Sequence, residues 1–255
     1  GIADMRPATF FYDSTAKRLY VWMHNGDDPT NHTVEPAVRC MAIRYYNYTH
    51  IDGITAMHCQ ARPSYDYCAI GGRNCEMGFN GNGGFRSAGS ERIHLIGNYW
   101  YDNSWRGYKP GWEDSTKVHG WVDCSFIGNR SKDDLCGIWV DVGSRNVLIA
   151  DNLVEGAGIG IYYEISRWGI IVNNILRSCY AGVNSYGSDV LISNNVFDRC
   201  YVGGGVYSTM RQEPLDGYPP YYPGNMCLMA MRNNMWVNNV ALRKGPDWYD
   251  WSGLQ

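Results

Sequence analysis

Two acidic residues close the same five-residue phrase in this chain. Gly-Ile-Trp-Val-Asp at 137–141 is followed by Gly-Ile-Tyr-Tyr-Glu at 160–164, so Asp141 and Glu164 lie 23 residues apart. Two carboxylates about 5–5.5 Å apart are the pair used by a retaining glycosidase, one as nucleophile and the other as acid and base. The competing interpretation is a pair of solvated surface acids on a repetitive scaffold. The spacing alone leaves both interpretations open.

A repeat of about 22 residues organises the chain around these acids. Six phrases place an apolar residue three positions before an asparagine, and the intervals between the asparagines are 31, 23, 22, 21 and 39 residues. Leucine-rich and helical repeats need patterns that are absent, and a β-sandwich would lack this register. The repeat predicts an all-β parallel β-helix with its asparagines stacked at one turn. The asparagines are Asn98, Asn129, Asn152, Asn174, Asn195 and Asn234, and the apolar residues are Leu95, Phe126, Ile149, Ile171, Ile192 and Met231.

This register places the two acids side by side. Asp141 lies twelve residues after Asn129, and Glu164 lies twelve residues after Asn152. Because paired strands lie about 5 Å apart, the carboxylates are expected at one position on adjacent coils. Like charges stacked in this way are unfavourable on a sheet. A structural role gives no reason to tolerate them, whereas a catalytic role does.

Strand alternation predicts which residues share the face of the acids. Ile138 and Val140 are expected to point into the core, so their neighbours point outward with the acids. Outward aromatic and amide side chains are candidates for substrate contacts, because they suit sugar rings and hydroxyl groups. These candidates are Trp139, Tyr162, Asn184 and Tyr186.

The two longest intervals contain insertions, at 101–121 and 209–226, that are expected to leave the coils near the acids. Loops longer than about a dozen residues on a regular scaffold are usually functional. Both insertions are rich in aromatic and cationic side chains, and we predict substrate contacts for His119, Trp121 and Arg211. For any single aromatic residue, packing within its own loop is the competing interpretation.

The two acidic phrases and the asparagine-rich coils resemble right-handed parallel β-helix glycoside hydrolases, in particular the β-xylosidase-like retaining family. The resemblance extends over about residues 90–240 and more loosely over 8–57. It implies a right-handed helix, with Asp141 as nucleophile and Glu164 as acid and base. The implied activity is hydrolysis of glycosidic bonds derived from plant or microbial polysaccharides. The β-sandwich portion of that family has no counterpart in this sequence.

Two other functions fit the same scaffold. A polysaccharide lyase would need a cationic side chain as base, for which Lys117, Arg167 and Arg211 are available, and often a Ca²⁺ site. The sequence has no acidic cluster beyond the pair, so no metal ion and no cofactor are predicted. A non-catalytic carbohydrate-binding or structural β-helix protein would use the same aromatic residues without turnover.

Composition limits the partners and the compartment. The net charge of −3 gives no reason to expect nucleic acid, and no apolar run is long enough for membrane insertion. Nine cysteines without a C-x-x-C pair, together with three glycosylation sequons, favour a secreted, extracellular or periplasmic protein. The expected partner is an oligosaccharide or polysaccharide. The sequence does not decide between a monomer and a homo-oligomer.

The chain is expected to divide near residue 50. Residues 1–49 read as a β lead-in or cap, with strands near 10–13 and 18–23, and residues 50–255 read as the β-helix domain. Solenoids need capping segments, and no capping pattern ends this chain. A longer parent protein is therefore expected.

The register makes two further structural predictions. Cys179 and Cys200 should stack on adjacent coils, either as a disulfide or as reduced thiols, because the spacing permits both. Asn129, as a stacked asparagine, should turn inward, so its Asn-Arg-Ser sequon should stay unmodified.

Overall fold

The chain divides into two compact units, Gly1–Ala37 and Val38–Gln255. The computed structural model describes residues 2–7, 9–23, 25–28, 31, 50–58, 72–81, 83–103, 116–206, 212–214, 226–228 and 234–244. In the first unit, a short 3-10 helix, η1 (Ile2–Asp4), precedes an antiparallel hairpin of β1 (Thr9–Asp13) and β2 (Arg18–Trp22). These are the two strands expected from the sequence. No helix in the described ranges is long and apolar enough to cross a membrane.

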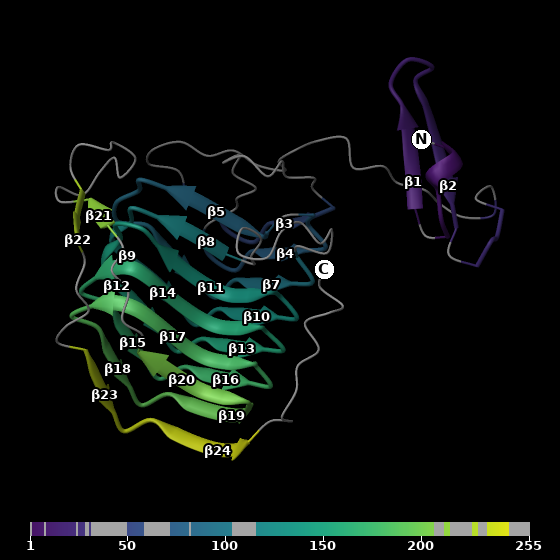
Figure 1. Cartoon of the computed structure of the whole chain (residues 1–255). Helices are drawn as coiled ribbons and strands as arrows, with labels where there is room; N and C mark the ends of the chain where they lie inside the picture. Colours follow the sequence, from purple (N-terminus) through teal and green to yellow (C-terminus); the bar gives the residue numbers. More distant parts are fainter. Residues whose placement is uncertain are drawn as a thin grey trace. The chain divides into compact units, whose positions relative to one another are not determined.

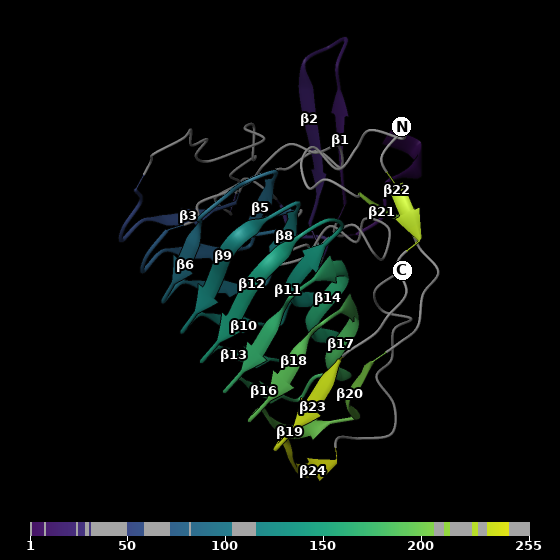
Figure 2. The same ribbon diagram turned by 90° about the vertical axis from the view of Figure 1, so that its left-hand side faces the viewer.

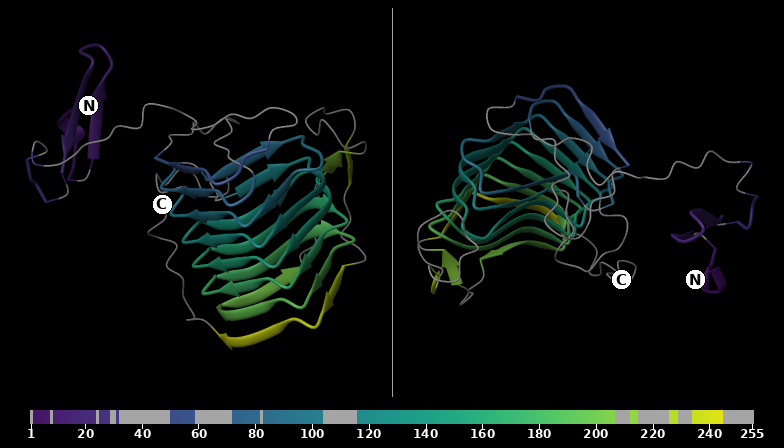
Figure 3. Two further views of the ribbon diagram at one scale, coloured as in Figure 1. Left: turned by 180° about the vertical axis from the view of Figure 1, so that it is seen from behind. Right: turned by 90° about the horizontal axis from the view of Figure 1, so that it is seen from above.

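The second unit is a parallel β-helix, which confirms the predicted fold (Figure 1). Its coils stack one above the other and follow a common outline when seen along the stack (Figure 3). Each complete coil contributes one strand to each of three faces. The first face, called the site face here, contains β5 (Phe85–Ala88), β8 (Thr116–His119), β11 (Cys136–Asp141), β14 (Ile159–Arg167), β17 (Ala181–Ser188) and β20 (Val202–Val206).

The other two faces complete each coil (Figure 2). The second face contains β6 (His94–Ile96), β9 (Val122–Ile127), β12 (Arg145–Ala150), β15 (Ile170–Val172), β18 (Leu191–Ser193) and β23 (Met235–Val237). The third face contains β3 (Thr55–Met57), β4 (Glu76–Gly78), β7 (Tyr99–Tyr101), β10 (Arg130–Lys132), β13 (Leu153–Glu155), β16 (Ile175–Arg177), β19 (Val196–Cys200) and β24 (Val240–Lys244). A separate antiparallel pair joins β21 (Gln212–Pro214) to β22 (Met226–Leu228).

The core of the second unit is a stack of inward apolar side chains, one above the next. The five described apolar residues of the repeat pair with one another across adjacent coils and are fully buried. Burial of a large apolar side chain contributes about 1.5–3 kcal/mol, so each coil is stabilised chiefly by the coils beside it. These residues are Leu95, Phe126, Ile149, Ile171 and Ile192.

The predicted asparagine stack is present at the turn after the second face. Each amide oxygen accepts the backbone and side-chain N–H groups of the asparagine on the preceding coil, at 2.9–3.0 Å. From Asn129 onward, each amide nitrogen also donates to the carbonyl of an apolar core residue on the preceding coil, as Asn129 does to Leu95. This bond links each turn to the backbone of the apolar stack. The turn amides thereby lock the apolar stack in register.

Among the described residues, the last member of this stack is Asn239, so the sequence alignment on Asn234 was wrong. Strand β23 pairs Met235 with Leu191, which brings Asn239 beside Asn195. Asn234 instead accepts the backbone N–H of Val190. The chain contains Asn-Asn pairs at both places, and the long insertion before them hid the correct one.

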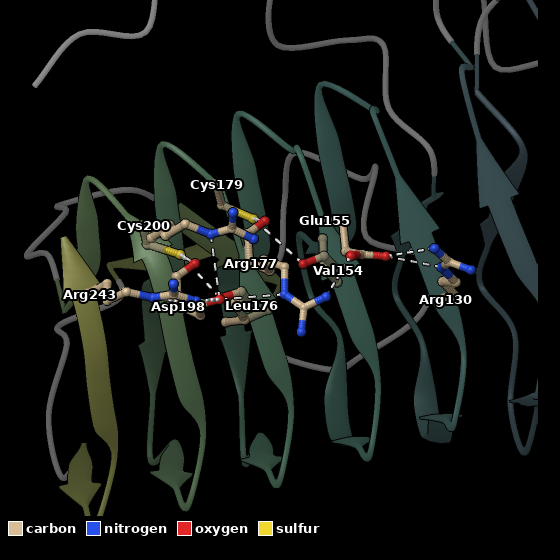
Figure 4. A network of polar contacts seen from close by, with 10 residues as sticks. Arg130, Val154, Glu155, Leu176, Arg177, Cys179, Asp198, Cys200 and Arg243 are labelled. Carbon is tan, nitrogen blue, oxygen red and sulfur yellow. Dashed lines mark hydrogen bonds and ion pairs between the residues drawn. The ribbon is translucent and has the colours of Figure 1, made fainter. Parts of the chain in front are cut away.

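The third face carries a ladder of charges with alternating sign (Figure 4). Glu155 accepts hydrogen bonds from Arg130 and Arg177, and Asp198 accepts them from Arg243. Arg177 also lies 3.5 Å from Asp198. Opposite charges on neighbouring strands support a sheet, whereas like charges destabilise it. The ladder therefore supports the stacking of these coils through opposite charges.

The stacked cysteines and Asn129 all lie inside the β-helix. Cys179 and Cys200 are both free and buried, so the reduced pair, and not the disulfide, is present. Asn129 is 2% exposed and its amide bonds within the asparagine stack. Its sequon is therefore closed to a glycan, as the register requires.

Candidate active site

Two columns of side chains stand side by side on the site face. Strands β8, β11, β14 and β17 pair in parallel with the 22–23-residue offsets expected from the sequence. The tryptophan column contains Lys117, Trp139, Tyr162 and Asn184. The carboxylate column contains His119, Asp141, Glu164 and Tyr186, in which Asp141 pairs with His119, and Glu164 with Tyr186.

The two acids lie outside the apolar core, on adjacent coils, but they are not open to solvent. Their neighbours Val140 and Tyr163 belong to the core cluster and the acids do not, which agrees with the predicted alternation. Asp141 is 7% exposed and Glu164 is 5% exposed, so the expectation of two solvent-facing carboxylates was wrong. Strand β21, from the second insertion, lies beside β14. Burial changes the chemistry, because charges in a water-poor site interact more strongly.

Asp141 is surrounded by groups that stabilise its charged form. The backbone N–H of Val142 donates to Oδ1 at 2.8 Å. The Nζ atom of Lys117 lies 3.3 Å from Oδ2, and Nε2 of His119 lies 3.4 Å from the same oxygen. Hydrogen bonds and ion pairs that involve a charged group are stronger than neutral ones. These contacts hold Asp141 in one orientation.

Glu164 has a different partner, a neutral indole. Nε1–H of Trp139 donates to Oε2 of Glu164 at 3.2 Å. Both faces of the same indole are covered, because Lys117 Nζ lies 3.1 Å from the ring centroid and Tyr162 stacks on it from the next coil at 5.0 Å and 24°. Trp139 is 5% exposed. The prediction that Trp139 binds substrate was therefore wrong, because a ring with both faces covered cannot stack on a sugar. Its N–H instead positions Glu164.

The backbone is strained directly after each acid. Val142 has φ +21° and Ile165 has φ +46°. Among the described residues with positive φ, these are the only two with β-branched side chains, for which this region is a true outlier. Glycine occupies the corresponding place after His119, at Gly120 with φ +57°. Strain of this kind clusters at functional sites, and at Val142 it aims the amide N–H at Asp141.

His119 is neutral over the physiological range. Burial lowers the pKa of His119 from 6.5 to about 4, Asp141 opposes this effect, and the cations Lys117 and Arg86 add to it. In the unfolded chain the imidazole takes up its proton near pH 6.5. Between these two values the unfolded state binds more protons than the folded state. Stability must therefore fall as the pH falls through this window.

We expect the wild type to lose up to about 3 kcal/mol of unfolding free energy between pH 7 and pH 4, relative to His119→Gln. The loss should level off below about pH 4, where both states are protonated. Urea unfolding of both proteins at half-unit steps of pH measures the difference. Parallel pH curves for wild type and His119→Gln would show that burial does not suppress protonation of His119.

The remaining candidates separate into three groups. Tyr162, Asn184 and Tyr186 are partly exposed beside the acids, and Tyr162 meets Tyr186 edge-on at 5.6 Å, so these three could contact a ligand. Trp121 is fully buried against Phe126, so the prediction of a substrate contact there was wrong. Arg211 lies outside the described residues.

From the sequence, Lys117 was considered only as a possible lyase base, and its contacts with Asp141 and Trp139 were not predicted. A signal was present: Lys117 precedes His119 by two, just as Trp139 precedes Asp141 by two. Recognising Thr-Lys-Val-His as the preceding strand would have placed Lys117 below Trp139. The insertion in front of that strand obscured the alignment. Among the described residues, no group of three or more His, Cys, Asp or Glu side chains could hold a metal ion.

The fold and the paired columns define a class, the parallel β-helix proteins that carry polar side chains on one outward sheet. Residues 42–197 match the model of the family described as right handed beta helix region, and the chain belongs to this family. The family assignment also fixes the hand of the coils as right-handed. No match was found among curated proteins, and none was found among solved structures.

Proposed function

We propose that this protein is a retaining glycoside hydrolase that acts, outside the cell, on oligosaccharides or polysaccharides. The observation that carries the proposal is that Asp141 and Glu164 each directly follow the paired residues Val140 and Tyr163, on adjacent coils of one outward face. Strands paired in register lie about 4.8 Å apart, close to the carboxylate separation of retaining enzymes. The paired strands of the third face, by contrast, alternate acidic and basic side chains. A like-charged pair held in a buried site fits a catalytic purpose better than a structural one.

The surroundings of the two acids suggest their roles. Asp141 has a cation and a backbone N–H at its oxygens, which suits a nucleophile that must be ionised before attack. Glu164 accepts a hydrogen bond from the indole N–H of Trp139, which fixes the direction of its carboxyl group. A general acid must be held in this way, within hydrogen-bond reach of the leaving oxygen. Asp141 is accordingly proposed as nucleophile and Glu164 as acid and base.

The proposed reaction has two steps. In the first, Asp141 attacks the anomeric carbon while Glu164 protonates the departing oxygen, giving a covalent glycosyl-enzyme. In the second, Glu164 removes a proton from water, and the water oxygen displaces Asp141 from the same carbon. Two inversions at one carbon leave its configuration unchanged.

A lyase is less well supported by the same contacts. A lyase base must accept a proton from the substrate, but Lys117 is 6% exposed and ion-paired with Asp141. A base must also reach the substrate proton, and this burial leaves Lys117 little access to it. Arg167 emerges after Glu164 beside Arg145 of the neighbouring coil, at the end of the strand and not in the carboxylate column.

The test is the stereochemistry of the product. We expect the protein to hydrolyse at least one member of a panel of aryl pentosides and hexosides. Proton NMR of the first product formed should show the anomeric configuration of the substrate. An inverted product would exclude the nucleophilic role of Asp141, and unsaturated products absorbing in the ultraviolet would indicate a lyase. Binding of oligosaccharides without turnover would indicate a carbohydrate-binding module.

A further inference from the structure

Lys117 is a buried cation held between two residues of the proposed site. Its side chain is 6% exposed, and its Nζ atom lies 3.3 Å from Asp141 Oδ2 and 3.1 Å from the centroid of the Trp139 ring. Strand pairing places Lys117 directly beside Trp139 on the preceding coil. The position is therefore set by the sheet and by two side chains. A flexible surface lysine would have no such restraint.

The other charged groups near Asp141 leave Lys117 as its cationic partner. His119 is neutral above about pH 4, because burial lowers its pKa. Arg86 pairs with Lys117 on the far side from Asp141, one coil further away. On the opposite side Glu164 adds a second acid. Within the described part of the chain, Lys117 is the lysine or arginine that forms an ion pair with Asp141.

We infer that Lys117 is a positioning residue that controls the second half of the proposed reaction, by stabilising the Asp141 carboxylate as it leaves the sugar. The inference rests on the proposed retaining mechanism. It concerns which of the two steps is slower, a question that the retaining mechanism alone does not decide.

The bond changes show why the effect falls on the second step. In the first step a bond forms between an Asp141 oxygen and the anomeric carbon, the glycosidic C–O bond breaks, and the leaving oxygen takes the proton of Glu164. Asp141 becomes an uncharged ester, so Lys117 loses the anion beside it. In the second step water bonds to the anomeric carbon, its proton passes to Glu164, and the ester electron pair returns to Asp141. A neighbouring cation opposes the first change and favours the second.

The wild type provides the first measurement. With a dinitrophenyl glycoside that it hydrolyses, the leaving group is so good that the first step is fast. We infer that Lys117 makes the second step at least as fast as the first. The glycosyl-enzyme then does not accumulate, and we expect no pre-steady-state burst of dinitrophenolate. A burst close to one equivalent of enzyme would show slow release of Asp141 despite the cation and would overturn the inference.

Lys117→Met supplies the second measurement, because methionine keeps much of the chain length and removes the charge. We expect a burst approaching one equivalent, a fall in kcat of at least about tenfold, and a parallel fall in KM as the glycosyl-enzyme accumulates. The ratio kcat/KM, which reports the first step, should be unchanged or raised, because the cation opposes that step. Lys117→Arg, which keeps the charge, should restore most of kcat and abolish the burst.

A merely structural role would give a different pattern. Loss of site geometry lowers kcat/KM together with kcat and produces no burst. Circular dichroism checks the fold of Lys117→Met, and Lys117→Gln takes its place if the methionine variant is unfolded. If the wild type hydrolyses none of the panel, the proposed function and the inference both fail. If the wild type hydrolyses a glycoside and neither neutral variant shows a burst, only the inference fails.

Discussion

Glu164→Gln is expected to slow hydrolysis of alkyl or sugar glycosides by about 10²–10⁴-fold and to leave the first step on dinitrophenyl glycosides nearly unchanged. The magnitude is that of general acid catalysis by a positioned side chain. Poor leaving groups need the proton of Glu164, whereas dinitrophenolate leaves without one. Glutamine can still accept the N–H of Trp139, so the site should remain assembled. The measurement is kcat/KM against leaving-group pKa for the wild type and the variant.

Asp141→Ala should be inactive on both kinds of substrate, because no leaving-group quality replaces a missing nucleophile. Azide separates the two roles further. With Glu164→Ala, azide can attack the glycosyl-enzyme and give a product of retained configuration. With Asp141→Ala, azide can only attack the substrate directly and would give inversion. Equal losses on good and poor leaving groups for Glu164→Gln would contradict the assignment of that residue.

A matched control comes from an acid on the solvent side of the scaffold. Glu91 is 61% exposed at its side chain and takes no part in either column. Glu91→Gln changes the same functional group and should retain wild-type kinetics on every substrate. A loss of activity there comparable to that of Glu164→Gln would mean that the effect reports on the fold and not on the site.

The coil register could be predicted because it follows from local chemistry that repeats. A stacked asparagine needs the same amide on the next coil and the same core carbonyl behind it, so the sequence repeats the phrase. The offset of 23 residues then carries over directly to Trp139 and Tyr162, which pair as expected. Where an insertion of unknown length interrupts the phrase, as before Asn239, the count fails.

The burial of the site could not be predicted from that register. Alternation assigns a side chain to the inner or outer face of a strand but does not say what lies over the outer face. Trp139 and Asp141 point outward, yet each is less than one tenth exposed. Trp121 shows the opposite error. It lies in an insertion and was therefore expected at the surface, but it is buried against Phe126. Both errors concern packing between segments distant in the sequence, which periodicity does not encode.

Asn152→Ala is expected to cost about 3–4 kcal/mol of unfolding free energy. Its amide oxygen accepts the backbone and side-chain N–H groups of Asn129, and its amide nitrogen donates to Phe126 O and to Asn174 Oδ1. Alanine leaves buried donors and acceptors without partners. Each buried group left without a partner costs about 1–3 kcal/mol. Urea unfolding measures the loss.

Asn239→Ala is the matched control, because Asn239 makes the same kind of bonds at the end of the stack. Its bonds to Asn195 and Ile192 are only partly buried, so water can replace them and the loss should be about 1 kcal/mol. Equal losses at Asn152 and Asn239 would contradict a role for burial in the stack. Because coils in a solenoid depend on their neighbours, damage at Asn152 should spread first to β11 and β14. Hydrogen exchange in those strands should then rise together with the loss of hydrolysis, since they position Asp141 and Glu164.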